Sequence, residues 1–200
     1  MHPNAAFRWT DRDAMRAMVA DIAFGALFAG TPDGPRVAHV PAVWLDDDTL
    51  GLHVARGNGI TRHLDGATAL FTVLGPDGYV SPDWYGLGPR QVPTWNYVAV
   101  ELEGVARRME RDALVAQIDQ LVADHESRIA DHQPWTRAKM EPKAFDAMLN
   151  AITGFRIEIV AWRGTLKLGQ NKPDAARGTA ADAVAANGRP AIARLMRSIG

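Results

Sequence analysis

The segment from Tyr79 to Tyr97 constrains the chain more than any other part of its sequence. It holds two of the six Trp, all three Tyr and three of the twelve Pro. Proline is poorly tolerated in a helix interior or a central strand, so the segment is predicted to be a structured loop. Aromatic rings with polar tips suit a surface that buries a flat ligand or a partner. A loop that only caps the core is the alternative from composition alone.

The order of residues in this segment is more specific than its composition. It reads Tyr-Val-Ser-Pro-Asp-Trp-Tyr at 79–85 and Val-Pro-Thr-Trp-Asn-Tyr at 92–97. Three further blocks are His-Val-Ala-Arg-Gly-Asn at 53–58, Phe-x-x-x-Gly-Pro at 71–76, and Gly-Phe at 154–155 followed by Gly-Thr-Leu-Lys-Leu-Gly-Gln-Asn at 164–171. In this order the blocks resemble the FMN-binding, PaiB-like family of negative transcriptional regulators. Two positions depart from the family pattern: Gly169 stands where Ser is expected, and Gly59 where Pro is expected.

The resemblance covers most of the chain and implies a fold, a cofactor and a partner. The implied fold is an antiparallel split β-barrel, like that of flavin-binding pyridoxamine-oxidase-type proteins. The implied partner is a second copy, because FMN in that architecture lies between the subunits of a homodimer. The implied function is negative regulation of transcription. A flavin- or haem-dependent oxidoreductase on the same scaffold is the alternative, since one fold hosts many chemistries. A structural or interaction protein with a vestigial pocket is a third interpretation.

Periodicity along the chain separately predicts an α+β fold, without distinguishing a barrel from a sandwich. Alternating or apolar runs predict strands at 36–45, 49–55, 67–74, 97–109 and 155–162, with a turn at 31–35 and an edge or bulge at Pro41. Amphipathic or Ala-rich runs predict helices at 11–21, 111–128, 145–152 and 175–199, the last interrupted around 187–190. With the split barrel that the resemblance implies, we expect an FMN-binding domain of that fold at 1–172, with a helical insertion at about 111–152, and a helical extension at 173–200.

The phosphate of FMN is a dianion, so its site needs cations and N–H donors. Arginine suits it best, because the planar guanidinium binds two oxygens at once. Arg56 follows a predicted strand and precedes a Gly-Asn turn, so Arg56 and Asn58 are predicted to contact the phosphate. His53, in the same block, is a candidate for a hydrogen bond near the cofactor. A surface arginine at the end of a strand is the competing interpretation of Arg56.

The ring of a flavin needs a flat apolar wall and polar groups for its heteroatoms. The aromatic segment offers both, and its candidate residues are Ser81, Tyr85, Trp95, Asn96 and Tyr97. A second set follows the last predicted strand, where C-terminal residues of related barrels help to hold flavin: Lys167, Gln170, Asn171 and Lys172. A solvated loop is the competing interpretation of that set. Packing of Trp84 and Trp95 in a dimer interface is the competing interpretation of the rings.

The remaining composition limits other classes of function. The absence of Cys excludes a disulfide framework or a thiolate metal site. No metal-ligand spacing, nucleophile motif or phosphate-binding glycine pattern occurs, so we predict no metal ligand and no catalytic residue. No apolar run approaches ~20 residues and no N-terminal signal is evident, so a cytoplasmic protein without a membrane segment is expected.

Charge gives DNA only weak support as a partner. The net charge is −1, which argues against a wholly basic nucleic-acid binder. From Arg163 onward, however, seven Lys and Arg stand against two Asp. No helix-turn-helix is evident unless the two C-terminal helical pieces form one. Solvated helix faces explain such a run equally well.

Overall fold

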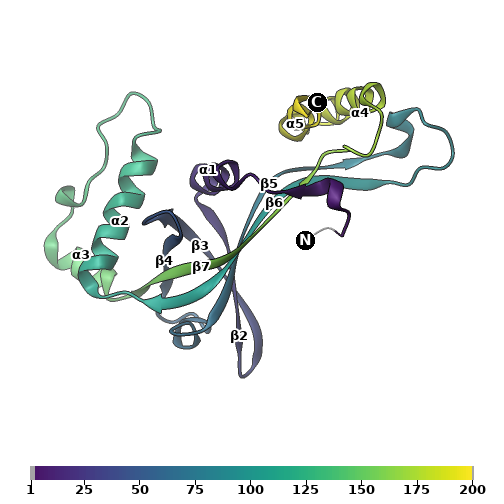
Figure 1. Cartoon of the computed structure of the whole chain (residues 1–200). Helices are drawn as coiled ribbons and strands as arrows, with labels where there is room; N and C mark the ends of the chain where they lie inside the picture. The colour runs from purple at the N-terminus through teal and green to yellow at the C-terminus, as the bar shows by residue number, and fades with distance from the viewer. Residues whose placement is uncertain (1–2, 200) are drawn as a thin grey trace. The chain divides into compact units, whose positions relative to one another are not determined.

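A computed structural model of the chain describes residues 3–199, so residues 1, 2 and 200 of the predicted domains lie outside it. The fold is α+β, as predicted, and it contains two compact units. The first unit comprises 1–18, 73–101 and 163–200; the second comprises 19–72 and 102–162. Strands β5, β6 and β7 contribute residues to both units (Figure 1). The predicted domains at 1–172 and 173–200 stay a prediction.

The strands form one seven-stranded antiparallel sheet. They are β1 (Arg8–Trp9), β2 (Phe24–Thr31), β3 (Gly34–Trp44), β4 (Thr49–Ala55), β5 (Thr68–Val80), β6 (Thr94–Arg108) and β7 (Ile152–Lys167). Their order is β1-β7-β4-β3-β2-β5-β6, and an additional pairing of β6 with β7 closes the strands from β7 to β6 into a ring. This arrangement confirms the predicted antiparallel split β-barrel.

The helices lie close to their predicted positions. The α-helices are α1 (Arg12–Ile22), α2 (Arg111–Glu126), α3 (Pro142–Leu149), α4 (Asp174–Ala186) and α5 (Pro190–Ser198). Short 3-10 helices are η1 (Ala5–Phe7), η2 (Thr61–His63), η3 (Pro82–Tyr85) and η4 (Arg137–Lys139). The C-terminal helical run is divided at Gly188, whose φ of 82° favours glycine and ends α4. Within residues 3–199, no helix is long and apolar enough to cross a membrane.

Strand β3 continues through Pro41 without a break, although the sequence indicated an edge or a bulge there. From Gly34 to Pro41 the strand pairs with β2, and from Ala42 to Trp44 it pairs with β4. Proline lacks the N–H group of a regular ladder. Pro41 is therefore tolerated because it lies where the strand changes from one partner to the other.

Strand β5 extends from its predicted end at Leu74 to Val80, through two glycines and a proline that usually end a strand. A Cβ atom on Gly75 would lie 2.8 Å from Cε of Met18, and one on Gly78 would lie 3.0 Å from Cγ2 of Ile192. These glycines therefore allow α1 and α5 of the first unit to pack directly on the strand. Close packing explains them better than a turn does.

In the second unit, helix α2 packs on two glycines of neighbouring strands. A Cβ atom on Gly51 of β4 would lie 3.0 Å from Cγ of Gln117, and one on Gly154 of β7 would lie 2.9 Å from Cδ1 of Leu114. Gly154 pairs with His53 of β4, so the two glycines lie close together on the sheet. Any larger residue at either position would push the helix away.

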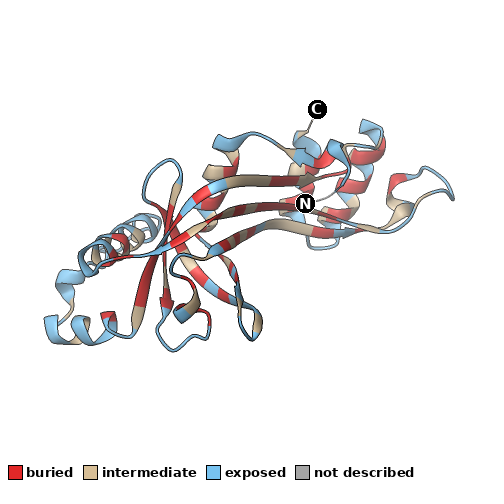
Figure 2. Cartoon of the chain, turned by 60° about the horizontal axis from the view of Figure 1, so that its bottom comes forward, coloured by how far each residue is buried: buried red, intermediate tan, exposed pale blue. Residues whose placement is uncertain are grey.

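Each unit has its own buried core. In the second unit the fully buried side chains alternate along the strands (Figure 2), and they include Leu50, Leu52, Phe71, Phe155 and Ile157. In the first unit, α4 and α5 cover a cluster that includes Val80, Tyr85, Val98, Ala180 and Ile192. Full burial of one large apolar side chain contributes about 1.5–3 kcal/mol relative to exposure. Both units are thus built from side chains of hydrophobic strands and small helical residues.

Candidate functional site

Two strands of the second unit end beside the start of a third. Strand β4 runs antiparallel to β7, with Val54 opposite Thr153, and the Arg56 N–H donates to the Ala151 carbonyl at 2.8 Å. On the other side of β7, the Met109 N–H donates to the Gly154 carbonyl at 2.9 Å. Arg56, just after β4, and Arg108, at the end of β6, therefore flank the first residues of β7.

The turn after Arg56 is fixed by its own polar groups. The Asn58 carboxamide oxygen accepts a hydrogen bond from the Ile60 N–H at 3.1 Å. The Thr61 hydroxyl donates to the Ala55 carbonyl at 2.8 Å. These bonds hold the turn although Gly59 stands where the family pattern has proline. The departure leaves an N–H group at this position that proline would lack.

Arg56 and Arg108 line one open cleft of about 410 Å³, here called the arginine cleft. Its walls are Arg56, Thr61, Arg62, Asp65, Arg108, Thr153 and Phe155. Three guanidinium groups thus face one carboxylate. Within residues 3–199, the guanidinium groups of Arg56 and Arg108 make no hydrogen bond or ion pair. Unpaired like charges that share a cleft repel one another and favour the binding of an anion.

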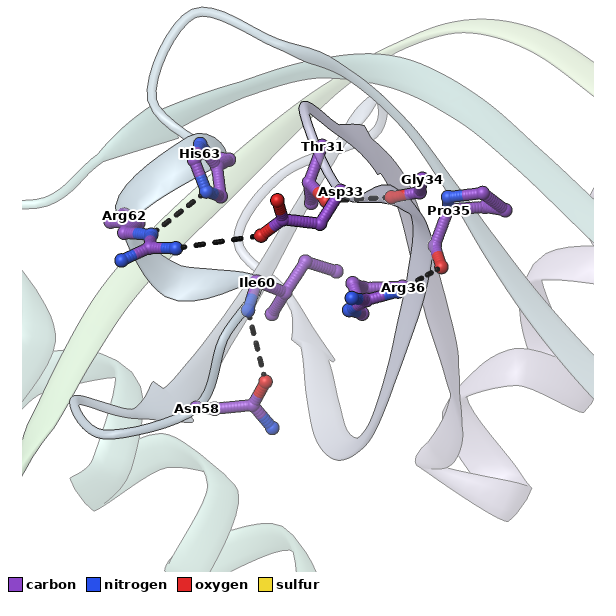
Figure 3. A network of polar contacts seen from close by, with 9 residues as sticks. All are labelled: Thr31, Asp33, Gly34, Pro35, Arg36, Asn58, Ile60, Arg62 and His63. Carbon is purple, nitrogen blue, oxygen red and sulfur yellow. Dashed lines mark hydrogen bonds and ion pairs between the residues drawn. The ribbon is translucent and has the colours of Figure 1, made fainter.

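The third arginine of the cleft is held by weak contacts. Arg62 Nη2 lies 3.8 Å from Oδ2 of Asp33, in the turn between β2 and β3 (Figure 3). Both side chains are mostly exposed, and such pairs contribute about 0–1 kcal/mol. Arg62 Nε also donates to Nε2 of His63 at 2.9 Å. These contacts therefore orient the Arg62 side chain without binding it tightly.

Asp65 has a structural role at the other end of the cleft. Its Oδ1 accepts a hydrogen bond from the Arg108 N–H at 3.0 Å. The carboxylate therefore fixes the backbone of Arg108 and leaves the guanidinium of that residue unpaired. The cleft keeps its excess of positive charge for this reason.

His53 lies under α2. Its Nδ1 is 3.3 Å from Oε1 of Gln117, a residue of α2 that is almost completely buried. Burial lowers the pKa of His53, and the hydrogen bond with Gln117 opposes this change only in part. Gln117 Nε2 finds no partner in the described part of the chain. The predicted contact of His53 with a cofactor stays a prediction.

In the first unit, the polar side chains after β7 are engaged with the chain itself. Lys167 Nζ donates to the Thr94 hydroxyl at 2.5 Å and lies 6.0 Å from the centre of the Phe7 ring. Burial lowers the pKa of this lysine. Lys172 Nζ donates to Gln91 Oε1 and lies 5.4 Å from the centre of the Tyr85 ring. Lys167 therefore contacts the start of β6, and Lys172 contacts the loop between η3 and β6.

Gln170 uses both ends of its carboxamide locally. Its Nε2 donates to the Leu166 carbonyl at 2.5 Å, and its Oε1 accepts from the Leu168 N–H at 2.8 Å. Asn171 is exposed. Gly169 has a φ of 85°, and a Cβ atom there would lie 3.4 Å from the Tyr85 hydroxyl. This backbone conformation accounts for glycine where the family pattern has serine.

The aromatic segment forms a partly exposed cluster of rings in the first unit. The Tyr79 ring lies 6.2 Å from Trp84 and 6.3 Å from Trp95, both in edge-to-face geometry. Half of the Trp95 surface is exposed, and so is 45% of Tyr79. Such rings provide an apolar wall that is open on one side.

The polar residues of this segment are more buried than the rings. Asn96 and Tyr85 are both buried, and burial raises the pKa of Tyr85. The Asn96 carboxamide lies close enough to oppose this rise, but it misses hydrogen-bond geometry, so its Nδ2 has no partner among residues 3–199. Ser81 caps η3 by accepting from the Asp83 N–H at 3.4 Å. Tyr97 is partly buried on β6.

The predicted site residues thus fall into two groups. His53, Arg56 and Asn58 belong to the second unit, and the nine others belong to the first. Sequence reasoning missed Arg62 and Arg108 of the arginine cleft. Arg62 lies about one helical turn after Asn58, and this spacing could have indicated that the two residues lie near the same site. Arg108 had none, because only the pairing of β6 with β7 brings it beside Arg56.

The described residues contain no cluster of His, Cys, Asp or Glu suited to a metal ion. The arginine cleft of the second unit is suited to binding an anion. The first unit presents the aromatic rings and the two lysines.

This chain belongs to the family described as "Putative FMN-binding domain", whose sequence model matches residues 1–161. The block at 164–171 lies beyond the matched residues. The chain is also similar to the protease synthase and sporulation protein PAI 2 of Bacillus subtilis (strain 168). The two are 28% identical over 170 residues, which make up 83% of this chain and 80% of the relative.

Two solved structures share the fold. The FAD and haem binding protein of Mycobacterium smegmatis is 20% identical, with a TM-score of 0.61 over 81% of this chain and 74% of that one. The flavocytochrome Anf3 of Azotobacter vinelandii is 13% identical, with a TM-score of 0.62 over 83% and 72% of the two chains. These similarities support the split-barrel fold. The ligand of this chain has to be inferred from its own residues.

Proposed function

We propose that this protein binds FMN with the phosphate in the arginine cleft, as a homodimer, and that it acts as a negative regulator of transcription. One observation carries the first part: Arg56 and Arg108 share a cleft and have no partner among the described residues. A phosphate dianion would satisfy both guanidinium groups with charge-assisted hydrogen bonds. Family membership supports FMN over other phosphates.

Several residues of the first unit have the chemistry that a flavin ring requires. The half-exposed rings of Trp95 and Tyr79 offer an apolar wall, and the unpartnered Asn96 amide offers a donor. Lys167 carries a charge beside them on the neighbouring strand β7. These features support Trp95, Asn96 and Lys167 as flavin contacts, and they support Ser81, Tyr97 and Asn171 less directly.

Exposed apolar side chains support a homodimer. In the second unit, Phe28 lies opposite Val37 across β2 and β3, and Phe24 lies on the same face. These three side chains are 39–52% exposed. A second copy would cover this face, and we expect an interface of roughly 1,600 Å² in total. Light scattering at micromolar concentration should give the mass of a dimer; a monomer mass would contradict this part of the proposal.

The regulatory role is supported by the family resemblance and by the relative named as a sporulation protein. The chain offers few cations for DNA, since Arg177 is buried and bonded to the Met196 carbonyl, and Arg197 pairs with Asp182 at 2.5 Å. We therefore expect indirect regulation, with no tight site-specific DNA binding by the isolated protein at physiological salt. A nanomolar, competitor-resistant mobility shift on its own upstream DNA would indicate a direct repressor instead.

A flavin- or haem-dependent oxidoreductase is the second candidate. It is favoured by the two solved structures of the same fold, which are named for FAD, haem or a flavocytochrome. Oxidation of reduced nicotinamide by the flavin-loaded protein distinguishes the two functions. Sustained turnover would favour the enzyme, and a haem absorption band in the purified protein would favour its haem form.

Titration of the purified protein with FMN and with riboflavin tests the cofactor. Riboflavin lacks the phosphate, so we expect FMN to bind about 100-fold more tightly, or about 2.7 kcal/mol. Flavin fluorescence reports both affinities. Equal affinities would remove the phosphate from the arginine cleft and with it the basis of the proposal.

A further inference from the structure

The carboxylate of Asp65 is held in place in the arginine cleft by the backbone around it. The chain turns at Gly66, whose φ of 79° favours glycine. The Gly66 N–H donates to the Ala106 carbonyl at 2.8 Å, and the Ala106 N–H donates to the Ala67 carbonyl at 2.9 Å. Further along β6, the Arg108 N–H donates to Oδ1 of Asp65 at 3.0 Å. Backbone and side-chain hydrogen bonds together therefore fix this carboxylate at the end of β6.

The hydrogen bond to Arg108 uses only part of what the Asp65 side chain offers. Oδ2 of Asp65 has no partner among residues 3–199, and the carboxylate forms no ion pair there with the arginines of the cleft. A backbone N–H needs only an acceptor oxygen, which a neutral carboxamide supplies equally well. The structural bond therefore accounts for an oxygen at this position and does not account for a negative charge.

The charge of Asp65 changes which anions the arginine cleft attracts. Three guanidinium groups and one carboxylate give the cleft a formal charge of +2, and its other walls are uncharged. A phosphate monoester carries about two negative charges at neutral pH, and a terminal diphosphate about three. Attraction to arginines grows with the charge of the ligand, so arginines alone would favour the diphosphate. The cleft is open, so its walls do not exclude the longer anion by size. Only the carboxylate opposes it.

We infer that Asp65 is a specificity-determining residue, whose charge makes the arginine cleft select phosphate monoesters against di- and triphosphates. The inference rests on the proposed function, because it assigns the cleft to the phosphate of FMN. Repulsion by a fixed carboxylate rises in proportion to the charge of the ligand, so it opposes a diphosphate about 1.5 times as strongly as a monoester. A neutral ligand such as riboflavin is not opposed. The selection thus comes from a repulsive element and not from a further attractive contact.

Calorimetric titration of wild type and Asp65→Asn with riboflavin, FMN, inorganic phosphate and inorganic pyrophosphate tests the inference. At about pH 8 the phosphate of FMN and inorganic phosphate are dianions. Asp65→Asn keeps an oxygen for the Arg108 N–H and removes the charge. We expect it to tighten FMN and phosphate about threefold and pyrophosphate about fivefold, with riboflavin unchanged. The gains should disappear in about 0.5 M salt, which screens exposed charges. Asp124→Asn is the matched control, because it makes the same change of charge outside the cleft.

The outcomes separate this inference from the proposed function. Affinities that Asp65→Asn leaves unchanged would reduce Asp65 to its structural bond, and an equal gain for phosphate and pyrophosphate would remove its role in selection. Weaker FMN binding by Asp65→Asn would mean that the carboxylate accepts a hydrogen bond from the ligand; each of these results overturns the inference while FMN binding stands. Equal binding of FMN and riboflavin by the wild type would instead overturn the proposed function, and the two inorganic anions would still report on Asp65. Thermal unfolding shows whether each variant is folded, and Asp65→Ser, which also keeps an acceptor oxygen, serves if Asp65→Asn is not.

Discussion

The arginines of the second unit and the lysines of the first unit carry the same charge and differ in what they already bind. Arg56 follows β4 and Arg108 ends β6, and the guanidinium group of neither has a partner within the described residues. Lys167 and Lys172 are hydrogen-bonded to Thr94 and Gln91 of their own unit. Sequence motifs mark Arg56 and Lys167 equally, but only Arg56 is left with its full capacity for an anion. Position along the motif thus says less about function than the partners that the fold supplies.

The difference has a structural cause. Position at a strand end is not this cause, because Lys167 ends β7 just as Arg108 ends β6. The cause is the set of neighbouring side chains: Thr94 at the start of β6 supplies a hydroxyl to Lys167, and Gln91 in the loop before β6 supplies a carboxamide to Lys172. A ligand that binds the lysines must replace these bonds, so each lysine contributes less net free energy than an unpaired arginine.

Replacement of Arg56 tests the stronger side of this comparison. Arg56→Ala should weaken FMN binding by about 2–4 kcal/mol, because the phosphate charge is left partly uncompensated. Riboflavin should be nearly indifferent to the change. Arg107→Ala is the matched control, since Arg107 is exposed beside Arg108 and does not line the arginine cleft. FMN affinity unchanged by Arg56→Ala would exclude this residue from the site.

Replacement of Lys167 tests the weaker side. Lys167→Met should weaken FMN binding by only about 1 kcal/mol, because the ammonium group gives up its bond to Thr94 when it binds the flavin. Lys143→Met on α3 is a control for the loss of charge. The same fluorescence titration applies to both. A loss of affinity as large as that of Arg56→Ala would show that internal hydrogen bonds do not reduce the contribution of the lysines to FMN binding.

Removal of the Asp33 charge tests whether Arg62, the weakly paired arginine of the cleft, can also contribute to phosphate binding. Asp33→Asn weakens the 3.8 Å contact with Arg62, which then becomes free for the phosphate. FMN should bind about twofold more tightly, the small effect expected of an exposed pair. The gain should disappear in 0.5 M salt, which screens exposed charges. Asp124→Asn, on the exposed side of α2, should change nothing; weaker FMN binding by Asp33→Asn would mean that the pair positions Arg62.

The smallest effect concerns pH and the buried His53. Its pKa in the folded protein is lowered from 6.5 by burial, so the unfolded chain binds the proton more readily. Stability is therefore unaffected above about pH 6.5 and falls as the pH drops from there toward the folded-state pKa. Urea unfolding at several pH values measures this slope. His53→Gln should flatten it, and an unchanged slope would assign it to other groups.

Alternation and amphipathic runs predicted most of the strands and helices, and the family resemblance supplied the split barrel. It missed the length of β5, because Gly75 and Gly78 are used for close packing and not for a turn. Arg56 and Asn58 were found because one motif contains them. Arg108 was not, because its role depends on strands far apart in sequence. The partners of Lys167 and Gln170 were equally invisible, since they depend on side chains that the fold brings together.

The hydrogen bond between Met109 and Gly154 has a consequence for how the chain can be edited. The backbone leaves the sheet and returns to it at one point, so α2, η4 and α3 form an excursion whose two ends already touch. Loop closure depends only slowly on length. The excursion can therefore be exchanged for a short hairpin without changing the register of β6 and β7. Such an exchange would expose Gly51, Gly154 and His53 to solvent, and it would leave the lining residues of the arginine cleft in place.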